Sequence, residues 1–188
     1  IIFNSGYNPR LITFLVRLPF MLISLLLGFY VYTWAGKLYG TNAGLLSLFI
    51  YSFNLAIIST SRLALTDLAA ATFFVIATYY FWLFNKKPKL KYIILAGIAT
   101  SFAFLSKETA VFLVPTFIIL LALNYKKIKI IKGIISLFLI ALISFLIIFA
   151  FYGFEVNTIE SSLTQHYKER AHEEISKRTG ENLKLRET

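Results

Sequence analysis

The chain has 188 residues, of which 58% are hydrophobic and 15% charged, and its mean hydropathy is +0.73. A soluble domain usually carries about 25% charged residues and about 45–50% apolar ones. This composition excludes a soluble domain, a disordered chain and a collagen-like repeat. Cysteine is absent, which excludes disulfides and thiolate metal sites.

The formal net charge of +10 is unevenly distributed along the chain. Residues 1–154 hold 13 Lys and Arg against 2 acids, whereas residues 155–188 hold 6 against 7. The basic excess of the first part lies in short loops between long apolar runs, which is typical of membrane topology and not of nucleic-acid binding. We therefore predict a transmembrane part, 1–154, an extramembrane part, 155–188, and no nucleic-acid partner.

The apolar runs predict an all-α, polytopic transmembrane helix bundle of about six spans, since a span needs about 17–25 apolar residues. Pro19 is expected to open the first span, because the missing N–H of proline costs nothing at the first helical position. One helix over residues 92–124 would reach about 50 Å, against a hydrocarbon core of about 30 Å. We therefore divide that run at a tight turn over residues 106–109. The predicted spans lie near 19–35, 43–58, 68–84, 92–105, 110–123 and 133–152.

Basic residues predict the orientation of the bundle. With the loop over residues 86–91 in the cytoplasm, alternation places Lys37 and the lysines of 126–132 there too. That side then collects nine basic residues and no acid, whereas the other side holds four basic residues and the acids Asp67 and Glu108. We expect a multi-pass protein of the cell membrane, with its N-terminus and its C-terminal tail extracytoplasmic.

The tail is expected to form one amphipathic helix. Apolar residues recur every four positions at Ile159, Leu163, Tyr167, Ala171 and Ile175. Thr158 is suited to cap this helix and Gly180 to end it. His166 and His172 would lie about 240° apart around a helix, so they do not predict a metal site.

Five ionisable residues fall at the outer ends of the predicted spans, namely Arg17, Arg62, Asp67, Lys107 and Glu108. Ionisable residues in or near spans are costly and often mark a site. Structural explanations remain open as well, because Asp67 is a natural N-cap, arginine can snorkel to the interface and Lys107–Glu108 can be plain turn residues. Three cations with one or two acids on one side favour an anionic ligand such as a phosphate.

Several short segments resemble one superfamily of membrane glycosyltransferases, the GT-C enzymes. Residues 61–67, Ser-Arg-Leu-Ala-Leu-Thr-Asp, are similar to its SR-x-x-x-TD segment. The superfamily's LAG, LSK-x-TA and P segment resembles three successive stretches of this chain: Leu95-Ala96-Gly97, Leu105-Ser106-Lys107-Glu108-Thr109-Ala110, and Pro115. Its R-L-P entry to a span resembles Arg17-Leu18-Pro19. Within this superfamily the segments resemble those of the protein O-mannosyltransferase-like and aminoarabinose-transferase-like enzymes. The family often has proline where Asn54 stands, and often glycine where Ser101 stands.

The resemblance implies transfer of a sugar, a hexose or a pentose, from a polyprenyl-phosphate donor to a protein or glycolipid acceptor on the extracytoplasmic face. It implies a catalytic role for Asp67 and substrate-binding roles for Arg17, Arg62, Lys107 and Glu108. It implies no certain cofactor: relatives can use a divalent metal, but this sequence predicts no metal site. The family's catalytic acid lies in the first outer loop, which would precede Ile1. We therefore expect the chain to be an internal fragment that is inactive alone.

Two other functions remain open. A transporter or permease would favour broken spans and polar groups at mid-membrane, whereas the charges of this chain gather at one side. A catalytically silent membrane scaffold of the same fold would keep the helices without the chemistry. An acidic pair in an outer loop upstream of Ile1 would favour the enzyme.

Overall fold

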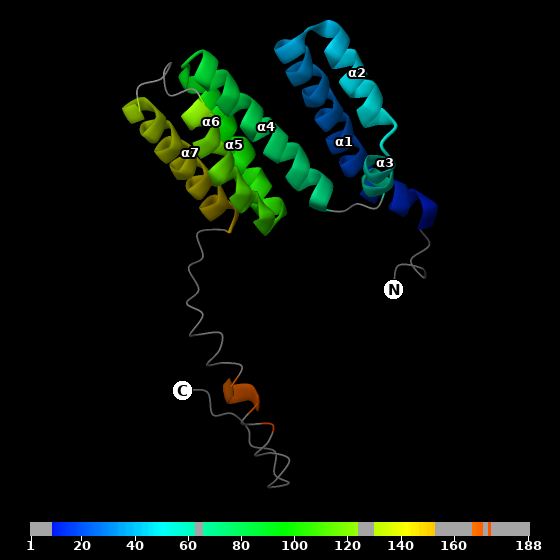
Figure 1. Ribbon diagram of the computed structural model, residues 1–188. Helices are drawn as coiled ribbons and strands as arrows, with labels where there is room; N and C mark the ends of the chain where they lie inside the picture. Colours follow the sequence, from blue (N-terminus) through cyan, green and yellow to red (C-terminus); the bar gives the residue numbers. More distant parts are fainter. Residues whose placement is uncertain (1–8, 63–65, 124–129, 153–166, 171–172, 174–188) are drawn as a thin grey trace. The chain divides into compact units, whose positions relative to one another are not determined.

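A computed structural model describes residues 9–62, 66–123, 130–152, 167–170 and 173. The chain divides into two compact units, Ile1–Ala150 and Phe151–Thr188. All the regular elements among the described residues are helical, which confirms the prediction of an all-α fold. In chain order the helices are α1 (Pro9–Tyr39), α2 (Thr41–Ser52), α3 (Leu55–Arg62), α4 (Thr66–Lys86), α5 (Leu90–Ser106), the 3₁₀ helix η2 (Glu108–Phe112), α6 (Leu113–Leu123) and α7 (Ile130–Phe151). Figure 1 labels the α-helices.

Helix α1 begins earlier than predicted. Pro9, not Pro19, is its first residue, and Pro19 lies inside the helix. The missing N–H of Pro19 costs one backbone hydrogen bond there. Membrane helices tolerate an internal proline because local adjustments and neighbouring groups satisfy the freed carbonyl. The expectation that Pro19 opens the span was therefore wrong.

The second predicted span, 43–58, is broken in the structure. Helices α2 and α3 meet at an angle of 62°, with Phe53 and Asn54 between them. The side chain of Asn54 accepts hydrogen bonds from the backbone N–H groups of Ala56 and Ile57, at 2.9 and 3.4 Å. Asn54 thus caps α3. A polar residue thus begins a new helix at the break.

The core lies between α4, α5 and α6. Ala96, Ala99 and Ala103 recur along one face of α5 and are buried, which lets the helix approach α4 closely. Phe81 of α4 and Phe117 of α6 are also buried, with ring centroids 4.5 Å apart. Small side chains of α5 and large rings of α4 and α6 thus fill the space between these helices.

Helix α7 packs closely on α5 at Gly97. A Cβ atom at that position would come within 2.9 Å of Ile143 of α7. The hydroxyl of Ser144 donates a 3.0 Å hydrogen bond to the carbonyl oxygen of Gly97. Small residues and interhelical hydroxyl bonds are the usual means of helix association in membranes.

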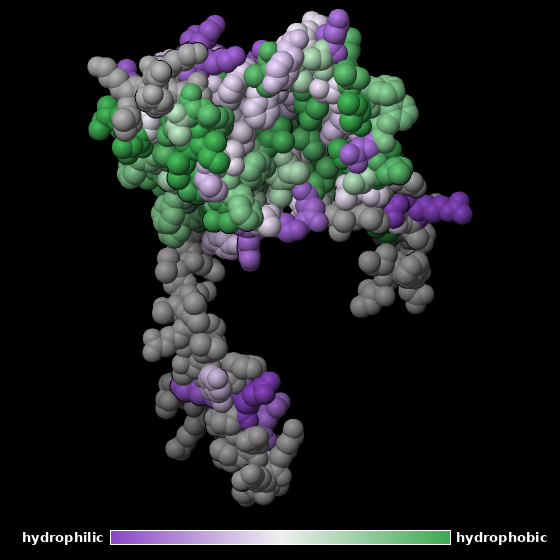
Figure 2. Space-filling view, viewed as in Figure 1, coloured by the Kyte–Doolittle hydropathy of each residue, from purple (hydrophilic) through white to green (hydrophobic). Residues whose placement is uncertain are grey.

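Three helices of the described part are long and apolar enough to cross a membrane, over Arg10–Tyr39, Thr66–Lys86 and Ile131–Phe151. The bent pair α2–α3 gives up to a fourth span, whereas Leu90–Ser106 and Glu108–Leu123 are shorter apolar helices. Figure 2 shows hydrophobic side chains covering much of the visible face of the helical unit, which suits contact with lipid. The chain is a multi-pass membrane protein, and the count of six spans stays a prediction.

Side-chain contacts identify which helix ends lie together. Lys37, near the end of α1, donates a hydrogen bond to the hydroxyl of Tyr79 in α4. Asn85, near the end of α4, donates to the carbonyl oxygen of Leu120 in α6 at 3.4 Å. Lys37 and Lys86 therefore belong to one end of the bundle, which we call the basic end. Its assignment to the cytoplasm stays a prediction.

The predicted tail helix falls mostly outside the described residues. Residues 167–170 are helical and exposed, in agreement with a helix there. His166, His172 and the predicted helix boundaries at Thr158 and Gly180 lie outside the described part.

Candidate functional site

One face of α4 forms the floor of the candidate site. Asp67, Ala70, Ala71, Phe74 and Val75 follow the spacing i, i+3, i+4, i+7, i+8, which places them on one side of a helix. The carboxylate lies in the first turn, two small residues follow, and two larger apolar residues come next. This face therefore changes from charged to apolar along the helix axis.

The opposite wall comes from the turn between α5 and η2. Helix α5 ends at Ser106, and Lys107 takes an extended backbone conformation with φ −162° and ψ 143°. The chain then re-enters a helical conformation at Glu108. The N–H of Lys107 still bonds to Ala103 and its carbonyl accepts from Ala110, so the turn is held at both sides. The break at Lys107 falls within the predicted turn over residues 106–109, but Ser106 still belongs to α5 and Glu108 and Thr109 already belong to η2.

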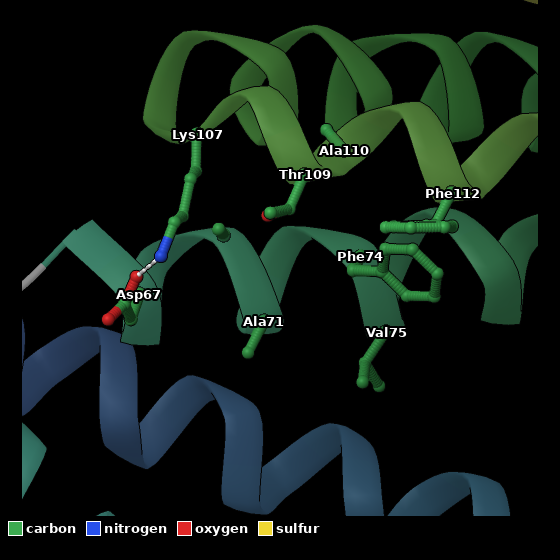
Figure 3. A pocket seen from close by; sticks show the side chains of 9 residues that line it. Asp67, Ala71, Phe74, Val75, Lys107, Thr109, Ala110 and Phe112 are labelled. Atoms are coloured by element: carbon green, nitrogen blue, oxygen red, sulfur yellow. Dashed lines mark hydrogen bonds and ion pairs between the residues drawn. The ribbon is translucent and has the colours of Figure 1, made fainter.

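Lys107 and Asp67 form an ion pair across the site. Lys107 Nζ donates to Asp67 Oδ1, as the dashed line in Figure 3 shows. Both side chains are about half exposed, at 43% and 53%, so the pair contributes little to stability, on the order of 0–1 kcal/mol. A primary ammonium group has three donors, which leaves two of them for a ligand.

A pocket of about 450 Å³ opens between these two elements. Asp67 and Lys107 line one part of it, and Phe74, Val75 and Phe112 line the rest, with Thr109 and the small side chains between them (Figure 3). Mostly apolar pockets with a few convergent polar groups are typical ligand sites. This one suits a ligand with an anionic group and an attached hydrocarbon chain.

The other predicted site residues are not gathered in this pocket. Arg17 is half-buried in α1, and Glu108 is exposed at the start of η2. Neither lines the pocket, and neither side chain forms a hydrogen bond or an ion pair with another described residue. Arg62 is the last residue of α3, and its side chain lies outside the described part.

Asp67 does not occupy the predicted N-cap position. Thr66 is already helical, so Asp67 lies within the first turn of α4. A carboxylate there still complements the helix dipole. Its described side-chain hydrogen bond goes to Lys107, which explains why the carboxylate faces the pocket.

Sequence reasoning missed the apolar lining of the pocket. The available signal was the run Ala69-Ala70-Ala71 directly after Asp67. Small side chains at the third and fourth positions after a charged residue leave a hollow on the same helix face. Phe112 carried no such signal, because its position depends on the turn at Lys107.

Metal ligands are not clustered in the described part of the chain. Among those residues, no group of three or more His, Cys, Asp or Glu side chains could hold a metal ion. The ionisable groups that line the pocket are the carboxylate of Asp67 and the ammonium group of Lys107.

Comparison with known families gives one match. Residues 12–152, which include every helix of the pocket and most of the helical unit, match the model of the dolichyl-phosphate-mannose-protein mannosyltransferase family. Comparison with curated proteins and with solved structures gives no significant match. Because the match covers well over half of the sequence, the chain belongs to the dolichyl-phosphate-mannose-protein mannosyltransferase family, and it is a membrane protein of the glycosyltransferase type.

Proposed function

We propose that the chain forms part of an enzyme that transfers a hexose or a pentose from a polyprenyl-phosphate donor to a protein or lipid acceptor on the extracytoplasmic face. One observation carries the proposal: the pocket has an ion pair in one part and an apolar lining in the other. A polyprenyl-phosphate sugar has the same division, with a charged phosphate joined to a long hydrocarbon chain. Family membership supports the same class of reaction.

Lys107 is proposed to hold the donor phosphate. In the reaction the bond between the sugar C1 and the phosphate oxygen breaks, and the phosphate leaves with the electron pair. A cation beside that oxygen stabilises the negative charge that develops on it, most strongly where water is scarce. Two donors of Lys107 are available for this contact while the third remains on Asp67.

Asp67 is proposed to act at the same centre. The acceptor hydroxyl forms the new bond to C1 and loses its proton, and a carboxylate is the usual group that takes such a proton. Asp67 also holds Lys107 over the pocket. Arg17, Arg62 and Glu108 stay proposed contributors to substrate binding outside this pocket.

The apolar lining is proposed to receive the first isoprene units of the donor. Phe74 and Val75 of α4 and Phe112 of η2 offer a hydrocarbon surface beside the ion pair. Burial of each CH₂ group contributes about 0.8 kcal/mol, so a few isoprene units add substantially to affinity. The phosphate is then held where polar and apolar surfaces meet.

Photocrosslinking in the full-length enzyme tests this function. Val75 is replaced by p-benzoylphenylalanine, and a radiolabelled polyprenyl phosphate is added before irradiation. We expect a labelled protein, competed by unlabelled polyprenyl phosphate but not by a polyprenol that lacks the phosphate. The matched control carries the same photoreactive group at Phe138, an exposed residue of α7. Equal labelling at both positions would refute the proposed site.

A further inference from the structure

A second cluster of interacting side chains lies at the basic end, away from the pocket. It consists of Trp34 and Lys37 of α1 and Tyr79, Trp82 and Lys86 of α4, and we call it the aromatic–lysine cluster. The Trp34 ring contacts those of Tyr79 and Trp82, with centroids 6.0 and 6.1 Å apart. Tyr79 and Trp82 stack at 6.2 Å. The rings therefore form one continuous aromatic surface across two helices.

Both lysines of the cluster lie on this aromatic surface. Lys86 Nζ is 4.0 Å from the centroid of Trp82, and Lys37 Nζ is 5.0 Å from that of Tyr79. Lys37 also donates to the Tyr79 hydroxyl. These contacts restrain two long side chains that would otherwise move freely in water.

No described acid neutralises these two cations. The acids of the described helical unit are Asp67 and Glu108, at the start of α4 and of η2. The cluster lies toward the opposite end of α4. The two exposed ammonium groups thus lie on two stacked rings, and each keeps donors available for an anion.

We infer that the aromatic–lysine cluster binds the headgroup phosphate of an anionic phospholipid. The cluster sits at the ends of α1 and α4, both long and apolar enough to span a membrane, so it lies where headgroups are found. Ordinary interfacial aromatic residues need no paired cations, whereas juxtamembrane lysines attract anionic lipid. This inference does not rest on the proposed function, because the pocket lies elsewhere.

The chain contains two tryptophans, and both belong to the cluster. Intrinsic tryptophan fluorescence therefore reports on this site alone. The full chain is reconstituted in phosphatidylcholine bilayers, and phosphatidylglycerol brominated near its headgroup is added in increasing mole fractions. The quenching is compared with that by phosphatidylcholine carrying the same bromines. We expect a relative affinity for the anionic lipid of about tenfold, which corresponds to about 1.4 kcal/mol.

Variants separate a specific site from general charge attraction. The double variant Lys37→Gln/Lys86→Gln should be quenched equally by both lipids, whereas Lys37→Arg/Lys86→Arg should keep the preference for phosphatidylglycerol. Lys87→Gln is the matched control, since Lys87 is exposed, adjacent in sequence and without a described ring contact. It should keep at least half of the preference.

Three results would overturn the inference. Equal quenching of the unmodified chain by the two lipids would show that no anionic headgroup is preferred. If Lys87→Gln lost as much of the preference for phosphatidylglycerol as the double variant, the preference would be an unspecific charge effect. Full reversal of the preference by soluble glycerol phosphate would show that the ligand is a free phosphate and not a lipid.

Discussion

Lys107 and Asp67, forty positions apart in the sequence, form an ion pair between the start of α4 and the turn after α5. The contact requires that turn, because a continuous helix through residue 107 would carry the ammonium group away from α4. The pair forms the charged part of the pocket, and apolar side chains line the rest. It is therefore the structural centre of the proposed donor site.

Replacement of Lys107 by alanine should weaken donor binding in the full-length enzyme. One charge-assisted hydrogen bond to the phosphate is lost, with an expected cost of about 1.5–3 kcal/mol. Direct binding of a polyprenyl phosphate, measured by calorimetry in detergent, gives the affinity. Lys132→Ala removes the same charge from an exposed position of α7 and should bind normally. Unchanged affinity in Lys107→Ala would remove this residue from the site.

Enlargement of Ala71 should block the apolar part of the pocket. Ala71 is an exposed residue on the pocket face of α4, so Ala71→Phe fills the hollow without disturbing the core. We expect KM to rise at least about tenfold for a long-chain donor, because isoprene units lose their contact surface. A short-chain donor should be affected less. Leu142→Phe, on the exposed surface of α7, is the control, and equal losses for both donor lengths would contradict the proposed tail site.

Gly97 should be required for packing of α7 on α5. The Cβ of Gly97→Ala would meet Ile143 at 2.9 Å, so one helix must shift, at a cost of about 1–3 kcal/mol. Thermal unfolding in detergent should show a lower midpoint. Gly36→Ala in α1 is the matched control, because nothing lies within 4 Å of its Cβ position. A midpoint of Gly97→Ala equal to that of Gly36→Ala would show that the contact is absent.

Cysteine labelling tests the orientation of the bundle. Lys89→Cys lies in the basic loop before α5 and should resist a membrane-impermeant maleimide added to intact cells. Thr66→Cys, exposed at the start of α4, should react. Permeabilised cells supply the control, in which both positions are labelled. Labelling of Lys89→Cys in intact cells would show that the basic loop lies outside the cell and that the predicted orientation is wrong.

The helical fold could be predicted from the apolar runs, but helix boundaries could not. Hydropathy depends on side chains, whereas the position of Pro19 inside α1 depends on how a membrane helix accommodates a missing N–H. The break at Asn54 likewise depends on a local side-chain cap, which hydropathy does not detect. Boundaries follow local hydrogen bonding more than composition.

The charged residues of the site could be predicted from the sequence, but the shape of the pocket could not. Asp67 and Lys107 stand out in an apolar sequence, and their placement on one side followed from alternation of spans. The run of alanines after Asp67 indicated the floor of the hollow, but its opposite wall depends on the contact between α4 and η2, which no local pattern encodes. Arg17 and Glu108 carry the same charge signal but do not line the pocket, because charge alone does not fix the direction of a side chain.

The central claim is that Asp67 takes part in the reaction and does not act only to stabilise the start of α4. Its carboxylate bonds to Lys107 and lies in the first turn of α4, and asparagine at this position would lose only the interaction with the helix dipole, about 0.3–1 kcal/mol. Asparagine cannot take a proton or carry the charge that holds Lys107. Asp67→Glu keeps the carboxylate and should retain more activity than Asp67→Asn.

The most direct measurement is the sugar-transfer rate of Asp67→Asn in the full-length enzyme, normalised to the amount of folded protein. We predict a fall of about 10²-fold or more, the scale for loss of an acid–base or charge contribution, with thermal stability nearly unchanged. A rate within a factor of two of the unmodified enzyme would contradict the account, because Asp67 would then be only a residue of the first helical turn.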